Sequence, residues 1–232
     1  KGVVGILSPW NFPVNLTFAP LAGVLAAGNR AMIKPSEYTP VTSALMKEVL
    51  EAAFDQSEIA VITGGPEVGK AFTELPFDHI IFTGATSVAR HVMAAAAKHL
   101  ASVTLELGGK SPVIVDNGAD IEKIAADLAG AKQFNGGQAC ISPDYVFIKE
   151  DQKTRLVEGF KATVAQNLYD ENGQIKKDSI AQIVNEANFN RVKALFDDAV
   201  AQGATVAVGG QMDATDLTIH PTLLTDVTPQ MK

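Results

Sequence analysis

The chain has 232 residues, 47% of them hydrophobic, and a formal net charge of −7 at pH 7. The hydrophobic content supports a sizeable core and excludes a disordered chain, and the acidic balance argues against a nucleic-acid-binding protein. The longest apolar stretch, residues 14–27, is shorter than the roughly 20 residues that cross a bilayer, so no membrane interaction is expected. A single cysteine removes any need for an oxidising compartment, and a cytoplasmic protein is therefore expected.

Short apolar runs alternate with runs of helical spacing along the whole chain. Continuous apolar strands between helices are typical of a parallel sheet covered on both faces, so the expected fold class is α/β. In chain order, the expected strands are residues 3–7, 31–33, 59–63, 79–82, 103–107, 111–116, 145–148, 204–208 and 222–226. The expected helices cover residues 15–27, 87–100, 120–134, 151–167 and 179–202, and a further helix follows Pro66. One more helix ends at Phe54, with Thr39 or Thr42 as its N-cap, and Asp120 is the expected N-cap of the helix over 120–134.

A second series of strands and helices begins after Gly108-Gly109, which predicts two parallel-sheet α/β domains, residues 1–107 and 108–232. The chain opens directly on an apolar run after Lys1-Gly2 and stops at residues 230–232 without closing a pattern. We therefore expect that parts of both domains are missing from this chain.

The only cysteine, Cys140, lies in the run Gly137-Gln138-Ala139-Cys140. A lone cysteine is most often a small buried hydrophobic residue. Here glycines precede it and Ser142-Pro143 follows, which predicts a loop where a thiol is accessible for nucleophilic chemistry. None of the four histidines lies in a motif, so the spacing does not support a Cys–His pair.

Two further residues are candidates for chemistry. Glu106 ends an apolar strand, where it would suit a general base that acts on water, although a cap or an ion pair explains it equally well. Asn11 is held between two aromatic residues and two prolines, and its amide would make an oxyanion donor, unless the segment is only a rigid turn.

Two strand ends could bind a nucleotide. Residues 82–86 read as strand, glycine turn and helix, a geometry that offers backbone N–H groups to phosphate, although any tight turn of this kind reads the same way. No G-x-G-x-x-G pattern follows a strand. Lys34 and Glu37 could hold ribose hydroxyls, or they could lie in a solvated turn.

Taken in order, five motifs resemble the aldehyde dehydrogenase superfamily over essentially the whole chain: Pro-Trp-Asn-Phe-Pro at 9–13, Lys-Pro-Ser-Glu at 34–37, Phe-Thr-Gly at 82–84, Glu-Leu-Gly-Gly-Lys at 106–110 and Gly-Gln-x-Cys at 137–140. The run from Cys140 to Tyr145, together with Asn15-Leu16-Thr17, is similar to the class 3 and coniferyl-aldehyde dehydrogenase branch. The resemblance implies a Rossmann-like NAD(P)-binding domain in residues 1–107 and a partial catalytic domain in residues 108–232.

The resemblance also implies an NAD(P)-dependent oxidation of an aldehyde to its acid. Cys140 would attack the aldehyde carbon, and the side-chain amide of Asn11 and the backbone N–H of Cys140 would hold the oxyanion. After hydride transfer, Glu106 would activate the water that splits the thioester.

By similarity, nine residues would contact the cofactor. Glu37 would hold the adenosine ribose and favours NAD, because its charge would repel a 2′-phosphate, although NADP stays open. Ala85 stands where many relatives have Ser, which puts one hydroxyl contact to the pyrophosphate in doubt. The resemblance implies no metal, and it implies a homodimer or homotetramer. The expected cofactor contacts are Ile6, Trp10, Lys34, Glu37, Gly65, Gly84, Ala85, Val88 and Leu107.

The family's C-terminal Glu-Ile-Phe-Gly-Pro motif has no counterpart in the chain. Two alternatives therefore stay open beside the aldehyde dehydrogenase. One is a CoA-acylating relative, which Glu106 argues against because a water-activating base serves hydrolysis. The other is a binding module that keeps the dinucleotide-binding fold and has no turnover of its own.

Overall fold

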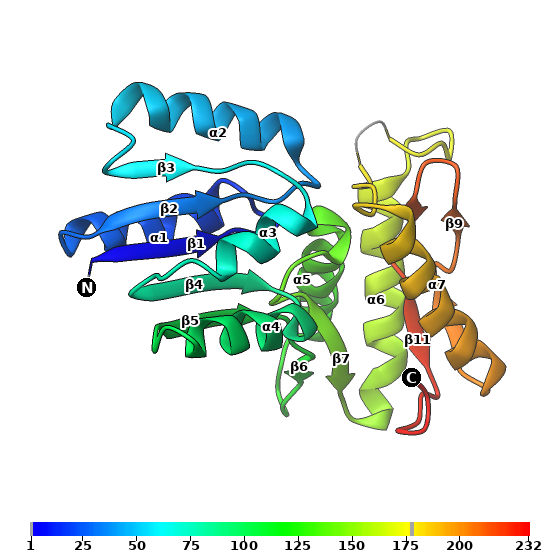
Figure 1. Cartoon of the computed structure of the whole chain (residues 1–232). Coiled ribbons are helices and arrows are strands. Elements are labelled where there is room, and N and C mark those ends of the chain that lie inside the picture. Colours follow the sequence, from blue (N-terminus) through cyan, green and yellow to red (C-terminus); the bar gives the residue numbers. More distant parts are fainter. Residues whose placement is uncertain (1, 177–178) are drawn as a thin grey trace. The chain divides into compact units, whose positions relative to one another are not determined.

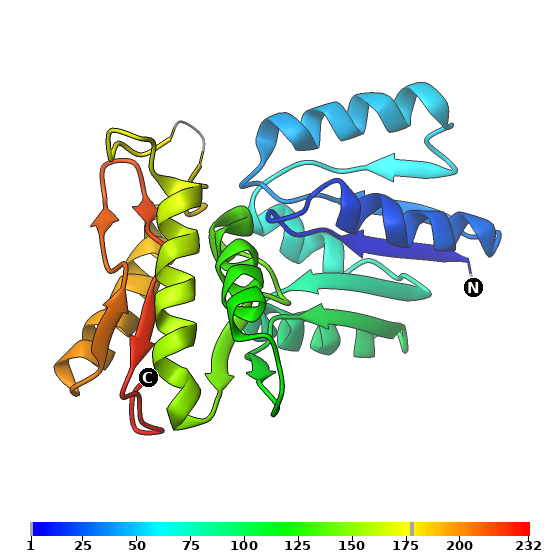
Figure 2. The same ribbon diagram turned by 180° about the vertical axis from the view of Figure 1, so that it is seen from behind.

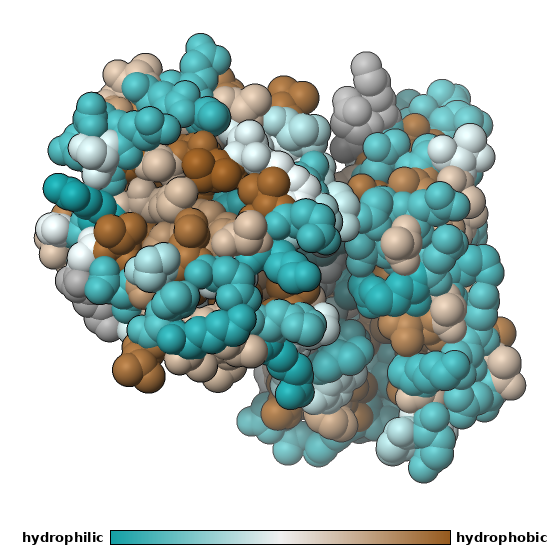
Figure 3. All heavy atoms as spheres, viewed as in Figure 1, coloured by the Kyte–Doolittle hydropathy of each residue, from teal (hydrophilic) through white to brown (hydrophobic). Residues whose placement is uncertain are grey.

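The computed structural model describes residues 2–176 and 179–232, and the chain divides into two compact units, Lys1–Gly108 and Gly109–Lys232 (Figure 1). In the space-filling view, a group of apolar side chains lies over the strands of the first unit, and polar side chains cover most of the visible face of the second (Figure 3). None of the helices in the described part of the chain combines the length and apolar composition of a membrane span.

The first unit is built on a five-stranded sheet in the order β3-β2-β1-β4-β5, with every neighbouring pair parallel. Four of the five residues of β1, at the centre, are buried, as expected for a strand that is covered on both faces. The prediction of a parallel α/β sheet is confirmed. The strands are β1 (Val3–Leu7), β2 (Arg30–Lys34), β3 (Ile59–Val61), β4 (His79–Gly84) and β5 (Ser102–Leu107).

Helices cover both faces of this sheet. One buried cluster joins Leu21 and Val24 of α1 (Asn15–Ala26) and Leu50 of α2 (Pro40–Ala53) to β1, β2 and β3. A second cluster joins α3 (Pro66–Thr73) and α4 (Thr86–Ala97) to β1 and β4. Helix α1, drawn in blue, lies in front of the sheet in the reverse view of Figure 2. The two clusters account for the continuous apolar character of the strands.

The second unit is built around two helices, α5 (Ile121–Gln133) and α6 (Glu150–Leu168), whose buried residues form one core. Gly159 explains how closely they approach, because a Cβ atom at this position would lie 2.8 Å from Cβ of Ala125. A parallel pair of strands, β6 (Ser111–Ile114) and β7 (Pro143–Phe147), precedes and follows α5. A short 3₁₀ helix, Phe134–Gly137, links α5 to the segment that carries Cys140.

The remainder of the second unit contains α7 (Glu186–Ala201) and two antiparallel pairs. The strands β8 (Thr205–Val208) and β11 (Leu223–Thr225) form one pair, and the two-residue strands β9 (Met212–Asp213) and β10 (Thr218–Ile219) form the other. This second pair was not predicted, and the unit therefore mixes parallel with antiparallel pairing.

The predicted helix over 179–202 was wrong at its start. Helix α7 begins at Glu186, because the side chain of Asn185 accepts a hydrogen bond from the Asn188 N–H and caps it. Asp120 caps α5 as predicted, through the Lys123 N–H. Thr39 occupies the N-cap position of α2, but its side chain makes no capping hydrogen bond.

Candidate active site

The carboxyl ends of the parallel strands bring several predicted cofactor residues to one edge of the first sheet. In the register, Leu7 lies beside both Lys34 and Phe82, and Gly84 lies beside Leu107. Ligands of open parallel α/β sheets bind outside this edge. The structure thus places Ile6, Lys34, Gly84 and Leu107 on the strands that lead to a binding edge.

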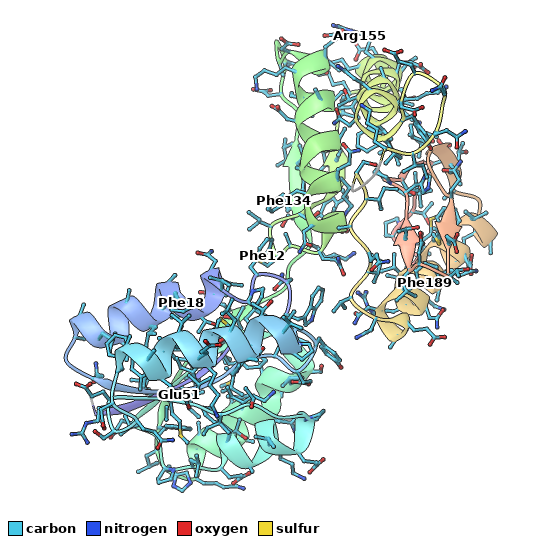
Figure 4. All side chains as sticks on the ribbon, turned by 90° about the horizontal axis from the view of Figure 1, so that it is seen from above. Phe12, Phe18, Glu51, Phe134, Arg155 and Phe189 are labelled. Carbon is cyan, nitrogen blue, oxygen red and sulfur yellow. The ribbon has the colours of Figure 1, made fainter. Side chains whose placement is uncertain are left out.

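A cavity of about 580 Å³ opens beside this edge, entirely within the first unit. Its walls come from the segment after β2, from one face of α2, and from the turn before α3. Glu37 and Gly65, both predicted from the sequence, line it, whereas the contribution of α2 was not predicted. The lining residues on α2 are Pro40, Ser43, Ala44, Lys47, Glu48 and Glu51, the last labelled in Figure 4.

Lys34 and Glu37 form an ion pair at this cavity, with Nζ 2.6 Å from Oε2. The Lys34 side chain is only 6% exposed and that of Glu37 is 29% exposed. Burial alone would raise the pKa of Glu37, but the hydrogen bond from Lys34, a backbone hydrogen bond and the nearby positive charge outweigh it and lower this pKa. Glu37 is therefore held as a carboxylate that could accept hydrogen bonds from ribose hydroxyls.

The turn between β4 and α4 has the form of a phosphate site. A Cβ atom at Gly84 would lie 2.6 Å from the Phe82 ring, so a larger residue would fit there only if that ring moved. Ala85 is the N-cap of α4, and no side chain caps the helix, which leaves its first N–H groups to another partner. Val88, one turn further, is 46% exposed.

Asn11 and Trp10 lie in the loop between β1 and α1, and both are partly buried. Oδ1 of Asn11 accepts a hydrogen bond from the Phe12 N–H at 3.1 Å. Because this contact uses the carbonyl end of the amide, the Nδ2 group is the end that can donate to an oxyanion. Phe12 is labelled on this loop in Figure 4.

Glu106 is the penultimate residue of β5, as predicted, and its side chain is exposed. It lies beside Thr83 in the register, two residues before the end of the first unit. Cys140 belongs to the second unit, so Asn11 and Glu106 on one side and the cysteine on the other come from different units.

Cys140 is exposed and lies beyond three consecutive left-handed residues. Asn135, Gly136 and Gly137 have φ values of 50°, 61° and 75°. A Cβ atom at Gly136 would lie 3.1 Å from the Ala181 carbonyl oxygen, and one at Gly137 would lie 3.3 Å from Cε of Lys132. Gly136 and Gly137 thus provide both the backbone conformation and the space for a sharp turn before the thiol.

The amide of Gln138 ties this turn to a distant part of the same unit. Its Oε1 accepts from the Val184 N–H at 2.9 Å, and its Nε2 donates to the carbonyl oxygens of Asn135 and Gln182, each at 3.0 Å. Both N–H donors of the side chain have partners, so its orientation is fixed two residues before the cysteine.

Lys132 supports the other side of the loop. Its Nζ donates to the Pro143 carbonyl oxygen at 3.1 Å and lies 3.4 Å from the Ser142 hydroxyl. Burial lowers the pKa of Lys132, and repulsion from Lys110 adds to this, while attraction to Asp144 opposes it.

The residues that follow β5 along the chain also contact the cysteine loop. The Ser111 hydroxyl donates to the Cys140 carbonyl oxygen at 3.4 Å, and Lys110 pairs with Asp144 at 2.9 Å. The second half of the Glu-Leu-Gly-Gly-Lys motif therefore lies against the loop of the Gly-Gln-x-Cys motif.

The sequence analysis missed Lys132 as part of this site. A lysine in the last turn of the helix before the cysteine motif was the available signal, because cations are favoured at helix C-termini. Two of the partners of Gln138, Gln182 and Val184, lie 44 and 46 residues away, and no local signal could have identified them.

Comparison with known proteins agrees with these features. The model of the "Aldehyde dehydrogenase family" matches residues 1–232. The chain is 51% identical over 232 residues to a putative aldehyde dehydrogenase, AldX, of Bacillus subtilis, and 52% identical over 237 residues to a probable coniferyl aldehyde dehydrogenase of Caulobacter vibrioides. These alignments cover 100% of the chain but 52% and 48% of the relatives, so the chain spans about half their length.

A solved structure gives the same result. The crystal structure of a variant of aldehyde dehydrogenase C from Pseudomonas syringae, in complex with NAD+ and octanal, superimposes with a TM-score of 0.90 at 28% identity, covering 100% of this chain and 49% of that one. Coniferyl aldehyde dehydrogenases and family 3 members are among the relatives, as the motifs predicted. The chain belongs to the aldehyde dehydrogenase family.

Proposed function

We propose that the protein oxidises an aldehyde to a carboxylic acid with NAD(P), through a covalent intermediate on Cys140. The observation that carries this proposal is the exposed thiol of Cys140 on a loop fixed by Gln138, Lys132 and Ser111, within a chain that matches the family along its whole length. An accessible thiol held in one geometry is what nucleophilic catalysis requires.

In the proposed reaction, the Cys140 thiolate adds to the aldehyde carbon and the carbonyl oxygen becomes an alkoxide. The Nδ2 group of Asn11 and the backbone N–H of Cys140 donate hydrogen bonds to this oxygen. A bound oxidised nicotinamide would supply the hydride acceptor, and loss of the hydride from the carbon would leave a thioester on Cys140. Glu106 then takes a proton from water, the resulting hydroxide attacks the thioester, and the acid and the thiolate are released.

The cofactor assignment rests on the cavity of the first unit. Glu37, held as a carboxylate by Lys34, suits the ribose hydroxyls, and the uncapped N-terminus of α4 at Gly84 and Ala85 suits a pyrophosphate. The remaining contacts proposed are Ile6, Trp10, Gly65, Val88 and Leu107. Since the carboxylate of Glu37 would repel a 2′-phosphate, we propose NAD as the preferred cofactor, with NADP as the weaker alternative.

The test is aldehyde-dependent NADH formation by the full-length protein and by its Cys140→Ala variant. We expect turnover in the wild type and none above background in the variant, because the covalent intermediate cannot form. Glu122→Gln, which removes an exposed ion pair with Arg155 in the second unit and keeps the thiol, serves as the control. Undiminished turnover by Cys140→Ala would overturn the covalent mechanism.

Product analysis separates the hydrolytic reaction from CoA acylation. With Glu106 as the base, the acid forms at the same rate with and without CoA, whereas an acylating enzyme would give a CoA thioester and stall without it. We expect Glu106→Gln to accumulate the thioester on Cys140, which intact-mass spectrometry detects after a single turnover.

The cavity of the first unit also favours a narrower candidate function for the 232-residue chain by itself, cofactor binding without turnover. Titration with NAD, followed by the fluorescence of the single tryptophan, Trp10, measures binding, and an aldehyde assay measures turnover. We expect weak binding and negligible activity; robust turnover by these 232 residues would contradict this candidate. The expected cytoplasmic location and the expected homodimer or homotetramer stay predictions from the sequence.

A further inference from the structure

Two buried hydroxyl groups hold the ends of the Asn11 loop. Oγ1 of Thr17, on a residue that is 0% exposed, lies 2.6 Å from Oγ of Ser8 and 2.6 Å from the carbonyl oxygen of Pro13. Ser8 directly follows β1, and Thr17 lies in the first turn of α1. Residues 9–13, which include Asn11, form the loop between these two points.

The number of hydrogens determines the direction of both contacts. A carbonyl oxygen only accepts, so Thr17 donates its single hydroxyl hydrogen to Pro13. The short contact between the two hydroxyls then requires Ser8 to donate to Thr17. Hence Thr17 is the central member of a chain in which each hydroxyl has a fixed orientation.

This hydroxyl chain is anchored to the sheet. The N–H of Ser8 donates to the carbonyl oxygen of Lys34 at 3.1 Å, which continues the pairing of β1 with β2 beyond Leu7. The side chain of Lys34 in turn holds Glu37 at the cavity. The loop that carries Asn11 is thereby connected to the same strand that positions the proposed ribose-binding carboxylate.

Packing alone does not call for these hydroxyls. Valine has nearly the volume of threonine and would fill the buried position without a polar group to desolvate. The Thr17 hydroxyl does not cap the N-terminus of α1 either, because Val14 is the N-cap and no side chain caps this helix. A buried hydroxyl pair at the two ends of one short loop therefore points to the need to fix that loop.

We propose that Thr17 and Ser8 are positioning residues for Asn11, and that together they hold its amide where it can stabilise the oxyanion. This inference rests on the proposed function, since it assigns the oxyanion to Asn11. Neither hydroxyl touches the substrate; both act through the backbone of residues 9–13. An oxyanion donor acts only when it is placed to within fractions of an ångström, so a loosened loop lowers the rate of the chemical step.

The experiment compares Thr17→Val, Ser8→Ala and Thr17→Ser in the full-length protein. Thr17→Val removes both contacts of the hydroxyl, and we expect kcat to fall about 10- to 100-fold, a larger change than the rise in the Kd for NAD, to which Trp10 of the same loop contributes. Ser8→Ala leaves the bond from Thr17 to Pro13 in place and should have a smaller effect. Thr17→Ser keeps the hydroxyl and should restore most of the rate.

Thr73→Val is the matched control. Thr73 is also buried in the first unit, and its hydroxyl donates to the Lys70 carbonyl oxygen at 2.8 Å in α3, away from the Asn11 loop. We expect its kcat to stay within about twofold of wild type. An equal fall in Thr73→Val and Thr17→Val would mean that any lost buried hydroxyl lowers the rate, and the positioning role would be refuted.

Combination with Asn11→Ala separates positioning from general destabilisation. If Thr17 acts through Asn11, Thr17→Val lowers kcat by less than about twofold once the Asn11 amide is gone, because the effects of groups that act as a unit do not add. A full additional fall in the Asn11→Ala background would overturn the proposal.

Amide hydrogen exchange at residues 10–12, the part of the loop between Pro9 and Pro13 that carries amide hydrogens, provides a readout that needs no turnover. We expect faster exchange there in Thr17→Val and Ser8→Ala, and wild-type exchange in Thr17→Ser and Thr73→Val. Unchanged exchange in Thr17→Val would disprove the link between the hydroxyls and the loop. A protein that shows the exchange effect but does not oxidise aldehydes would instead refute the proposed function and leave the structural link intact.

Discussion

Lys34 and Glu37 are joined by a 2.6 Å ion pair in which the cation is almost fully buried and the carboxylate reaches the cavity. The side chain of Lys34 passes α3 at Gly69, where a Cβ atom would lie 3.7 Å from its Cε atom. The buried ammonium group of Lys34 thus fixes the Glu37 carboxylate through the ion pair, while the partly exposed carboxylate remains available to a ligand. We expect both the recognition of the cofactor and the stability of the first unit to depend on this pair.

For cofactor recognition, we predict that Glu37→Gln weakens NAD binding about 10- to 100-fold and narrows the preference for NAD over NADP. The loss corresponds to roughly 1.5–3 kcal/mol for hydrogen bonds to a charged group, and the removed charge no longer repels a 2′-phosphate. Titrations of Trp10 fluorescence with both cofactors measure the two constants. Glu74→Gln, which removes an equally short but exposed pair with Lys98, should leave both within about twofold; an unchanged preference in Glu37→Gln would contradict the assignment.

For stability, we predict that Glu37→Gln lowers the free energy of unfolding of the first unit by about 1–3 kcal/mol, because it leaves a buried cation without its partner. The double variant Lys34→Met/Glu37→Gln should be more stable than Glu37→Gln, since it removes the unpaired charge as well. Urea unfolding gives both values. Should the double variant be the less stable of the two, the burial of an unpaired Lys34 would not be the cause.

The lowered pKa of Lys132 predicts a pH dependence of stability. Between this lowered pKa and the unfolded value of 10.5, the unfolded chain binds more protons than the folded one, so stability rises with pH across this window. We expect the free energy of unfolding of wild type to increase relative to Lys132→Met as the pH is raised toward 10.5. Lys123→Met removes an exposed lysine on the same helix whose pKa is raised by Asp127, so its difference in stability from wild type should stay flat up to pH 10.5 and shrink only above it. A flat difference for Lys132→Met below pH 10.5 would contradict a destabilising burial of this charge.

The turn before the cysteine predicts a difference between two glycines. Gly118 and Gly136 both have positive φ, 80° and 61°, but a Cβ atom meets nothing within 4 Å at Gly118 and lies 3.1 Å from the Ala181 oxygen at Gly136. Gly118→Ala should therefore cost about 1 kcal/mol from backbone strain alone, and Gly136→Ala about 1–2 kcal/mol more. Urea unfolding and the rate of Cys140 alkylation by iodoacetamide check this, and only Gly136→Ala should alter the alkylation rate.

The sequence predicted those strands and helix caps that are determined by residues close together in the chain. The five parallel strands followed from short continuous apolar runs, and the cap of α5 followed from an aspartate before a helical pattern. The strands β9 and β10 have two residues each, too few to show any alternation of apolar and polar residues. The start of α7 was misplaced because residues 179–184 are partly apolar, which favours a helix that begins earlier. In the structure these residues are not helical, and their backbone at Gln182 and Val184 binds the side chain of Gln138.

The residues of the candidate site also fall into those that local sequence predicted and those that it did not. Cys140, Glu106 and Gly84 were recognisable because each stands in a motif at the end of an element. The support around them was not, because it consists of pairs that only the fold brings together. Thr17 and Ser8 are nine residues apart with a loop between them, and two partners of Gln138, Gln182 and Val184, are more than forty residues away.

The three left-handed residues before Cys140 determine when the loop conformation that presents the thiol can form. A chain segment with φ positive at residues 135, 136 and 137 is not a state that an isolated peptide prefers, so it exists only once the Gln138 amide has found the 182–184 backbone. The geometry that presents the sulfur is thus acquired with the fold of the second unit and is lost with it. We therefore expect the rate at which Cys140 reacts with an alkylating reagent to report whether the second unit is folded.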